Sequence, residues 1–142
     1  MQRESELRLA SNDEFNALLN SILEQATLFL EEIGSFYPFG TTVSSTGTVI
    51  PLGVYIDNEM DSSEVPILLG KAIDEKFKRS EIIAAAIAAD VNFKTSPNDE
   101  PSRAIQIKLS HLIEEPLDYY LIYSIIGRKC SIEKCLFYPG SN

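Results

Sequence analysis

The sequence predicts one α+β domain, in which two amphipathic helices pack on a mostly antiparallel sheet of five to six strands. Two stretches repeat apolar residues at every third or fourth position, which is the helical period. Other stretches are rich in β-branched residues or alternate apolar with polar side chains, and most follow one another without a helix between them. The 142 residues suit one domain, so we expect residues 1–142 to form one unit, with a loose leader over 1–10 and a loose tail over 139–142.

The first helix is predicted over residues 12–33. Ser11 and Glu14 have the spacing of a capping box, in which Ser11 is the N-cap and Glu14 reaches back to it. Gly34 follows the helix and can take the positive φ that ends many helices. The apolar stripe of this helix consists of Phe15, Leu18, Leu19, Ile22, Ala26, Phe29, Leu30 and Ile33.

Three aromatic residues come next, around a proline. We call Phe36, Tyr37, Pro38 and Phe39 the aromatic segment. One interpretation is a plug that closes the core beneath the first helix. The other is an aromatic surface that faces a ligand or partner, with Phe36, Tyr37 and Phe39 as its contact residues.

Two strands are predicted over 41–45 and 48–56, with the turn at Thr46-Gly47. Pro51 has no N–H to donate, which places the second strand at a sheet edge or at a bulge. A second helix is predicted over 63–79, and Pro66 is tolerated in its first turn. Its apolar stripe consists of Val65, Leu68, Leu69, Ala72, Ile73 and Phe77.

Residues 82–93 favour both helix and strand. Their first half contains only isoleucine and alanine, and alanine is a strong helix former. Their second half alternates apolar residues with Asp90 and Asn92, which is the period of a strand. We interpret the segment as a central strand that is buried on both faces at its start. Further strands are predicted over 104–112, 117–126 and 131–138, with a hairpin turn at Glu114-Glu115 between the first two.

The order of these elements resembles a family of small, uncharacterised bacterial α+β proteins of about the same length. The likeness rests on the first helix, the phrase Phe36-Tyr37-Pro38-Phe39-Gly40, the turn at Gly47, and two strand-like phrases at 86–91 and 103–107. It covers roughly residues 15–125. The resemblance implies a strand over 82–93, and it implies no activity.

Charge and composition exclude several classes of function. The net charge of −9 repels phosphate, so we expect no nucleic-acid partner. No apolar run approaches the roughly 20 residues of a membrane span, and the polar start lacks the pattern of a secretory signal. We therefore expect a cytoplasmic protein without a membrane partner, in which Cys130 and Cys135 are thiols.

The sequence contains no phosphate loop, dinucleotide turn, nucleophile elbow or zinc-helix motif. We expect no cofactor and no metal. The acidic run near Asp61 has the odd spacing of a calcium loop, but Ser62 and Leu68 stand where glycine and glutamate are needed.

The candidate catalytic residues are His111, Asp118, Tyr120 and Asp90. A tight turn at Glu114-Glu115 would place His111 opposite Asp118, with Tyr120 nearby on the same face. A histidine oriented by a carboxylate can act as a general base, and the same pair can equally be a structural salt bridge. Asp90 follows an apolar run and is placed at the end of a strand, beside a possible pocket.

Three functions remain open. We expect a non-enzymatic protein-interaction module, which binds a partner protein or forms a homodimer through a sheet edge or through residues 122–126. The first alternative is a small-ligand binder or enzyme with a pocket near Tyr37, Tyr55, Asp90, His111 and Tyr120. The second alternative is an antagonist of a basic toxin or nuclease, because such a partner would be attracted by an acidic domain.

Overall fold

The computed structural model describes residues 12–53 and 61–140, and within these ranges it confirms the predicted α+β class. The predicted leader over 1–10 lies outside the described residues, as does the part of the second predicted strand from residue 54 to 56. In chain order the elements are α1 (Asp13–Glu32), β1 (Phe39–Ser44), β2 (Val49–Leu52), a 3₁₀ turn (Ser62–Glu64), α2 (Val65–Lys78), β3 (Ile82–Phe93), β4 (Ser102–His111), β5 (Leu117–Ile126) and β6 (Lys129–Pro139).

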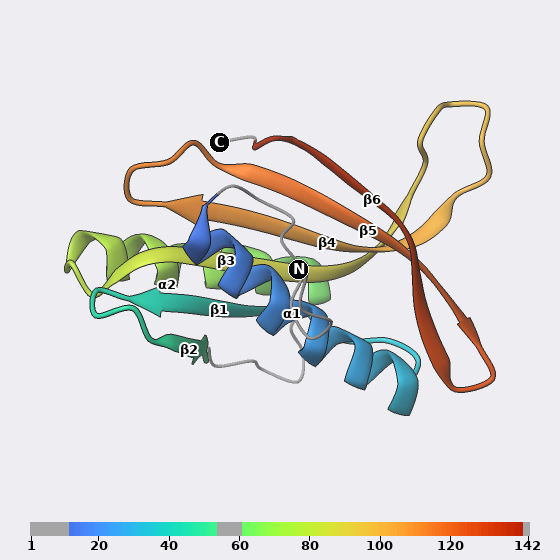
Figure 1. Cartoon of the computed structure of the whole chain (residues 1–142), viewed down its shortest axis with the longest axis horizontal. Helices are drawn as coiled ribbons and strands as arrows, with labels where there is room; N and C mark the ends of the chain where they lie inside the picture. Colours follow the sequence, from blue (N-terminus) through green and yellow to red (C-terminus); the bar gives the residue numbers. More distant parts are fainter. Residues whose placement is uncertain (1–11, 54–60, 141–142) are drawn as a thin grey trace, which may run out of the picture.

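The strands form one six-stranded sheet in the order β2-β1-β3-β4-β5-β6, and every neighbouring pair is antiparallel. The two helices lie on opposite faces: α1 in front of the sheet and α2 behind it in Figure 1. The described part of the chain contains no helix that is long and apolar enough to cross a bilayer. The strand order makes β2 and β6 the two edges of the sheet.

The strand β3 lies between the two helices, which explains why its sequence favoured two interpretations. Ala84, Ala86 and Ala88 face the core under α1, whereas Ala85 faces the core under α2. Small side chains on both faces let both helices approach the strand closely. The strand predicted over 82–93 is confirmed. Its residues up to Ala89 are mostly buried, and those from Asp90 to Phe93 are more exposed, as expected.

The first helix begins and ends close to the predicted residues, but its cap differs. The N-cap is Asn12, whose Oδ1 accepts the backbone N–H of Phe15 at 2.9 Å. The predicted capping box with Glu14 is wrong, because the Glu14 carboxylate contacts His111 instead. Gly34 has a φ of 93°, as predicted for the residue that ends the helix.

The two helices cover the sheet unevenly. The core under α1 contains side chains from β1, β3, β4 and β5, whereas the core under α2 contains side chains from β2 and β3. The far side of the sheet over β4, β5 and β6 is consequently not covered by α2. The strand β6 is mostly exposed along its whole length.

Candidate functional site

The structure separates His111 from Asp118. A tight turn at Glu114-Glu115 would pair the two, but in the observed register Asp118 pairs with Lys108. The loop is wider because His111 itself closes it: its Nδ1 accepts the N–H of Ile113 at 3.0 Å and that of Glu114 at 3.1 Å. The predicted register of this hairpin is therefore wrong.

Both ring nitrogens of His111 have partners within the described chain. Since Nδ1 accepts two backbone N–H groups, the network assigns the proton to Nε2, which lies 2.9 Å from Glu14 Oε1. The ring also makes an edge contact with Phe15. His111 thus joins the loop after β4 to the first turn of α1, and neither nitrogen faces an open site.

Asp118 and Tyr120 lie on the opposite face of the sheet from His111. Asp118 forms an ion pair with Lys108 at 3.6 Å, directly across the strands. The Tyr120 hydroxyl accepts a hydrogen bond from Gln106 at 3.0 Å, and its ring stacks on Phe93 with 4.3 Å between centroids. The predicted base, His111, and its two predicted partners, Asp118 and Tyr120, are therefore not brought together.

Asp90 belongs to a polar cluster at the C-terminal end of α1. Its carboxylate accepts the Tyr123 hydroxyl at 2.7 Å and the Arg103 guanidinium at 2.9 Å. The same guanidinium donates to the carbonyl of Gly34 at 2.8 Å and lies 5.0 Å from the Tyr123 ring centroid. Burial, and then the hydrogen bond that it donates to Asp90, raise the pKa of Tyr123. The cluster ties the end of α1 to three strands.

The candidate catalytic residues are also far apart along the sheet. Asp90 pairs with Ile105, and His111 lies six residues further along β4, which corresponds to about 20 Å. The described residues contain no group of three histidine, cysteine, aspartate or glutamate side chains that could hold a metal ion. We find no assembled reactive centre among the residues the structure describes.

The aromatic segment divides between the two interpretations. Phe36 and Phe39 are half-buried against the core and form a three-ring cluster with Phe29 of α1, with centroids 5.4 to 6.5 Å apart. Tyr37 is 63% exposed. Two rings therefore act as the predicted plug, and one faces outward.

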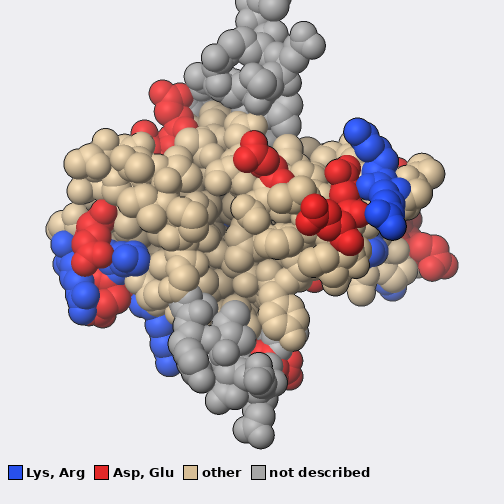
Figure 2. All heavy atoms as spheres, turned by 90° about the horizontal axis from the view of Figure 1, so that it is seen from below, with Lys and Arg blue, Asp and Glu red and all other residues tan. Residues whose placement is uncertain are grey.

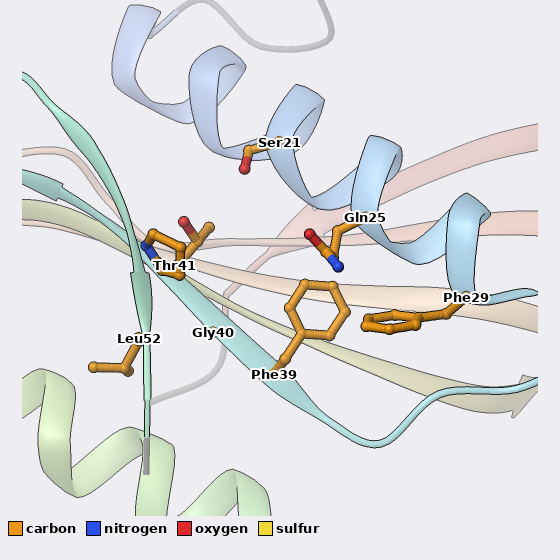
Figure 3. Close-up of a pocket in the computed structure, with 8 residues that line it drawn as sticks. Ser21, Gln25, Phe29, Phe39, Gly40, Thr41 and Leu52 are labelled. Carbon is orange, nitrogen blue, oxygen red and sulfur yellow. The ribbon is translucent and has the colours of Figure 1, made fainter.

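Shallow hollows adjoin the aromatic segment on several sides. One of about 240 Å³ lies between α1 and the β1–β2 hairpin, where Ser21, Gln25 and Phe29 point toward Phe39 and Thr41 (Figure 3). A second, of about 430 Å³, is shared by Phe29 and the aromatic segment. Seen from the β2 side, the basic side chains gather mainly toward the two ends of the molecule, and acidic side chains also lie between them (Figure 2).

A third hollow, of about 560 Å³, contains part of the pocket that the sequence predicted. Tyr37, Asp90 and Gln106 line it, together with Pro66 of α2. His111 and Tyr120 do not line it, and Tyr55 lies outside the described residues. The predicted convergence of all five residues is therefore not observed.

The two cysteines are free and lie on the same strand. Cys130 pairs with Ile125 and Cys135 with Leu121, so both face the α1 side of the sheet. A regular strand would turn them to opposite sides, but a bulge at Glu133 inserts one unpaired residue between them. Four positions of β5 separate them, about 13 Å, which is too far for a disulfide.

A sheet edge was predicted as a homodimer contact without specifying the strand, and the outer edge of β6 is one of the two edges in the described sheet. Gly140 donates its N–H to Pro116 on the β5 side at 2.8 Å. Since strand backbone groups alternate in direction, the N–H and C=O groups of Cys135 and Phe137 point away from β5. The sheet order ends at β6, so no strand of the described chain pairs with these groups.

The first half of β6 is closed to another strand. The N–H of Cys130 also points away from β5, and it donates to the Glu31 carboxylate of α1 at 2.9 Å. The bulge at Glu133 follows, and the Glu133 side chain accepts a hydrogen bond from Ser124 at 2.6 Å. We call residues 129–133 the closed half of β6.

The second half, residues 134–139, we call the open half. Its side chains are held in place but remain accessible: the Phe137 ring is 61% exposed and stacks on Tyr119 with 5.4 Å between centroids. Tyr138 is 43% exposed and meets the Tyr120 ring edge-on at 5.9 Å. At the start of the tail that was predicted to be loose, Pro139 ends β6 and Gly140 donates its N–H to the Pro116 carbonyl.

Comparison with models of known protein families, with curated proteins and with solved structures found no match. The resemblance to a family of small bacterial proteins therefore stays a prediction. The function has to be argued from the chain itself.

Proposed function

We propose that this protein is an interaction module that binds another polypeptide as an added strand along the open half of β6. The observation that carries the proposal is the outward row of backbone N–H and C=O groups at Cys135 and Phe137, flanked by two half-exposed aromatic rings. An unpaired edge of this kind is a template for pairing with an additional strand. In that mode of recognition the backbone supplies affinity and the side chains supply specificity.

This edge is better preorganised for binding than the hollows around the aromatic segment. Phe137 and Tyr138 are fixed by contacts with Tyr119 and Tyr120 before any partner arrives, so little side-chain entropy is lost on binding. Rigid aromatic residues are the usual centres of binding energy at interfaces. The hollows around the aromatic segment offer apolar contact but no row of backbone groups.

The polar candidates support the non-enzymatic interpretation. His111, Asp118 and Asp90 each have a structural partner on a neighbouring element. Within the described residues, both ring nitrogens of His111 contact Glu14 or backbone N–H groups, so the histidine is not hydrogen-bonded to the serine or cysteine nucleophile that a triad would require.

A proline substitution tests the proposal. Phe137→Pro removes an outward N–H and leaves the β5–β6 ladder intact, whereas Val49→Pro makes the same change at the outward side of β2. We expect Phe137→Pro to abolish association, both of the purified chain in light scattering and with any protein captured from a lysate. Val49→Pro should leave both unchanged, and circular dichroism checks that both variants fold.

Two outcomes would contradict the proposal. The first is association that persists in Phe137→Pro. The second is a wild-type chain that neither self-associates nor captures any protein.

A further inference from the structure

We propose that the strand that pairs with the open half of β6 is the same segment of a second copy, antiparallel about a two-fold axis at Leu136. This inference rests on the proposed function and adds the identity of the partner.

Symmetry limits the registers to a few. A two-fold axis perpendicular to the sheet keeps each side chain on its own face, so residues that lie opposite each other must point to the same face. The axis must therefore lie between the two copies of one residue, and we name each axis by that residue. An axis at Glu133 or at Lys134 would place like charges directly opposite each other, which is destabilising. An axis at Cys135 would place the two Lys134 side chains diagonally, about 7–8 Å apart.

The axis at Leu136 avoids all of these conflicts. It places Leu136 opposite Leu136 of the second copy and Cys135 opposite Phe137, so the outward backbone groups of these two residues meet each other. Residues 134–138 of both copies then pair, and the bulged Glu133 stays outside the paired segment. An axis at Phe137 also avoids like charges, but it places Cys135 opposite Pro139 of the second copy, which has no N–H to donate.

The same register matches side chains by chemistry on both faces. On the face away from α1, Lys134 lies opposite Tyr138 of the second copy, which permits a cation–π contact. On the α1 face, Cys135 lies opposite Phe137 of the second copy, which permits a sulfur–aromatic contact. Each contact occurs twice because the pairing is symmetric. A strand of different sequence would have to reproduce this order in reverse to fit equally well.

Net charge gives the dimer a recognisable salt dependence. Each chain has a net charge of −9, so two copies repel each other over long range. The open half itself carries only Lys134, so the contact surface makes no charge pair that salt would weaken. Added salt screens the repulsion, and we expect the dimer to become tighter from low to high salt.

Cysteine cross-linking tests the register. In a background of Cys130→Ser and Cys135→Ser, the Leu136→Cys substitution places two thiols across a non-hydrogen-bonded pair, where Cα atoms lie about 4.5 Å apart, within disulfide range. The matched control is Lys134→Cys on the same face of the same strand. Its two thiols would lie about 13 Å apart along the pairing, too far to bond.

We expect mild oxidation to convert most of the Leu136→Cys protein into a covalent dimer and to leave the Lys134→Cys protein monomeric on a non-reducing gel. Wild-type chain at micromolar concentration should show twice the monomer mass in light scattering, and more so at higher salt. A wild-type mass of one chain overturns the inference, as does equal cross-linking of the two variants.

The failure of this inference can be distinguished from the failure of the proposed function. A monomeric chain that still captures another protein, in a manner abolished by Phe137→Pro, refutes the second copy as partner and leaves the edge as a binding site. A dimer whose mass is unchanged by Phe137→Pro refutes both.

Discussion

The two edges of the sheet are built in opposite ways. The edge strand β2 is four residues long, contains Pro51 at an outward position, and has the Ile50 carbonyl accepting the Thr41 and Thr42 hydroxyls. The edge strand β6 is eleven residues long, and only its first half is protected, by Glu31 and the bulge. Short length, proline and bulges are the usual means by which proteins prevent unwanted pairing. The open half contains none of them before Pro139, its last residue, so the stretch from Lys134 to Tyr138 is the exception in this fold.

The largest difference between the edges should appear in stability. Tyr119 is 1% exposed and lies beneath Phe137 of the open half. We expect Tyr119→Ala to lower the free energy of unfolding by about 3–5 kcal/mol, because removing a buried aromatic ring leaves a cavity. Val49→Ala at the exposed β2 edge should cost less than about 1 kcal/mol. Urea denaturation measures both, and equal losses would mean that the β5 ring beneath the open half contributes no more to stability than an exposed residue of β2.

A smaller effect is expected where α1 protects the closed half. Glu31→Ala removes the carboxylate that accepts the Cys130 N–H, which should cost about 1 kcal/mol and accelerate hydrogen exchange of that amide. Glu32→Ala is the control, since this neighbouring carboxylate is exposed. If exchange at Cys130 were unchanged in Glu31→Ala, or accelerated as much in Glu32→Ala, the carboxylate would not be what protects the closed half.

The smallest effect concerns pH. Burial raises the pKa of the Cys130 and Cys135 thiols, and the nearby Glu31 carboxylate adds to the rise at Cys130. The unfolded chain therefore ionises first, so stability is fully present below the ordinary thiol pKa of about 8.5 and falls as pH rises above it. Replacing both thiols by serine should make this fall shallower in urea denaturation at a series of pH values. The residues of β2 have no titratable side chain, so Val49→Ala should leave the slope unchanged.

Sequence reasoning predicted the fold because the local signals agreed with the final structure. The apolar period located both helices, the alternation after Ala89 identified β3 as a strand, and Pro51 placed β2 at an edge. Each of these signals acts within a few residues, so the sequence contains it without reference to the rest of the chain.

The features that sequence reasoning missed depend on distant contacts. The register of β4 and β5 follows from the His111 ring, which accepts two backbone amides and widens the loop. The protection of Cys130 by Glu31 joins residues 99 positions apart. The aromatic segment was predicted as a candidate surface from composition, but the open half of β6 is visible only once the strand order is known.

The bulge at Glu133 limits how far two edges can come together. Without the extra residue, β6 would present one uninterrupted row of outward backbone groups, and a neighbouring strand could bind it in several slipped positions. Slippage of that kind leads from a closed pair to open-ended stacking of sheets. Glu133, which has no partner residue on β5, therefore confines the pairing of a second strand to the open half, where a single alignment can be selected.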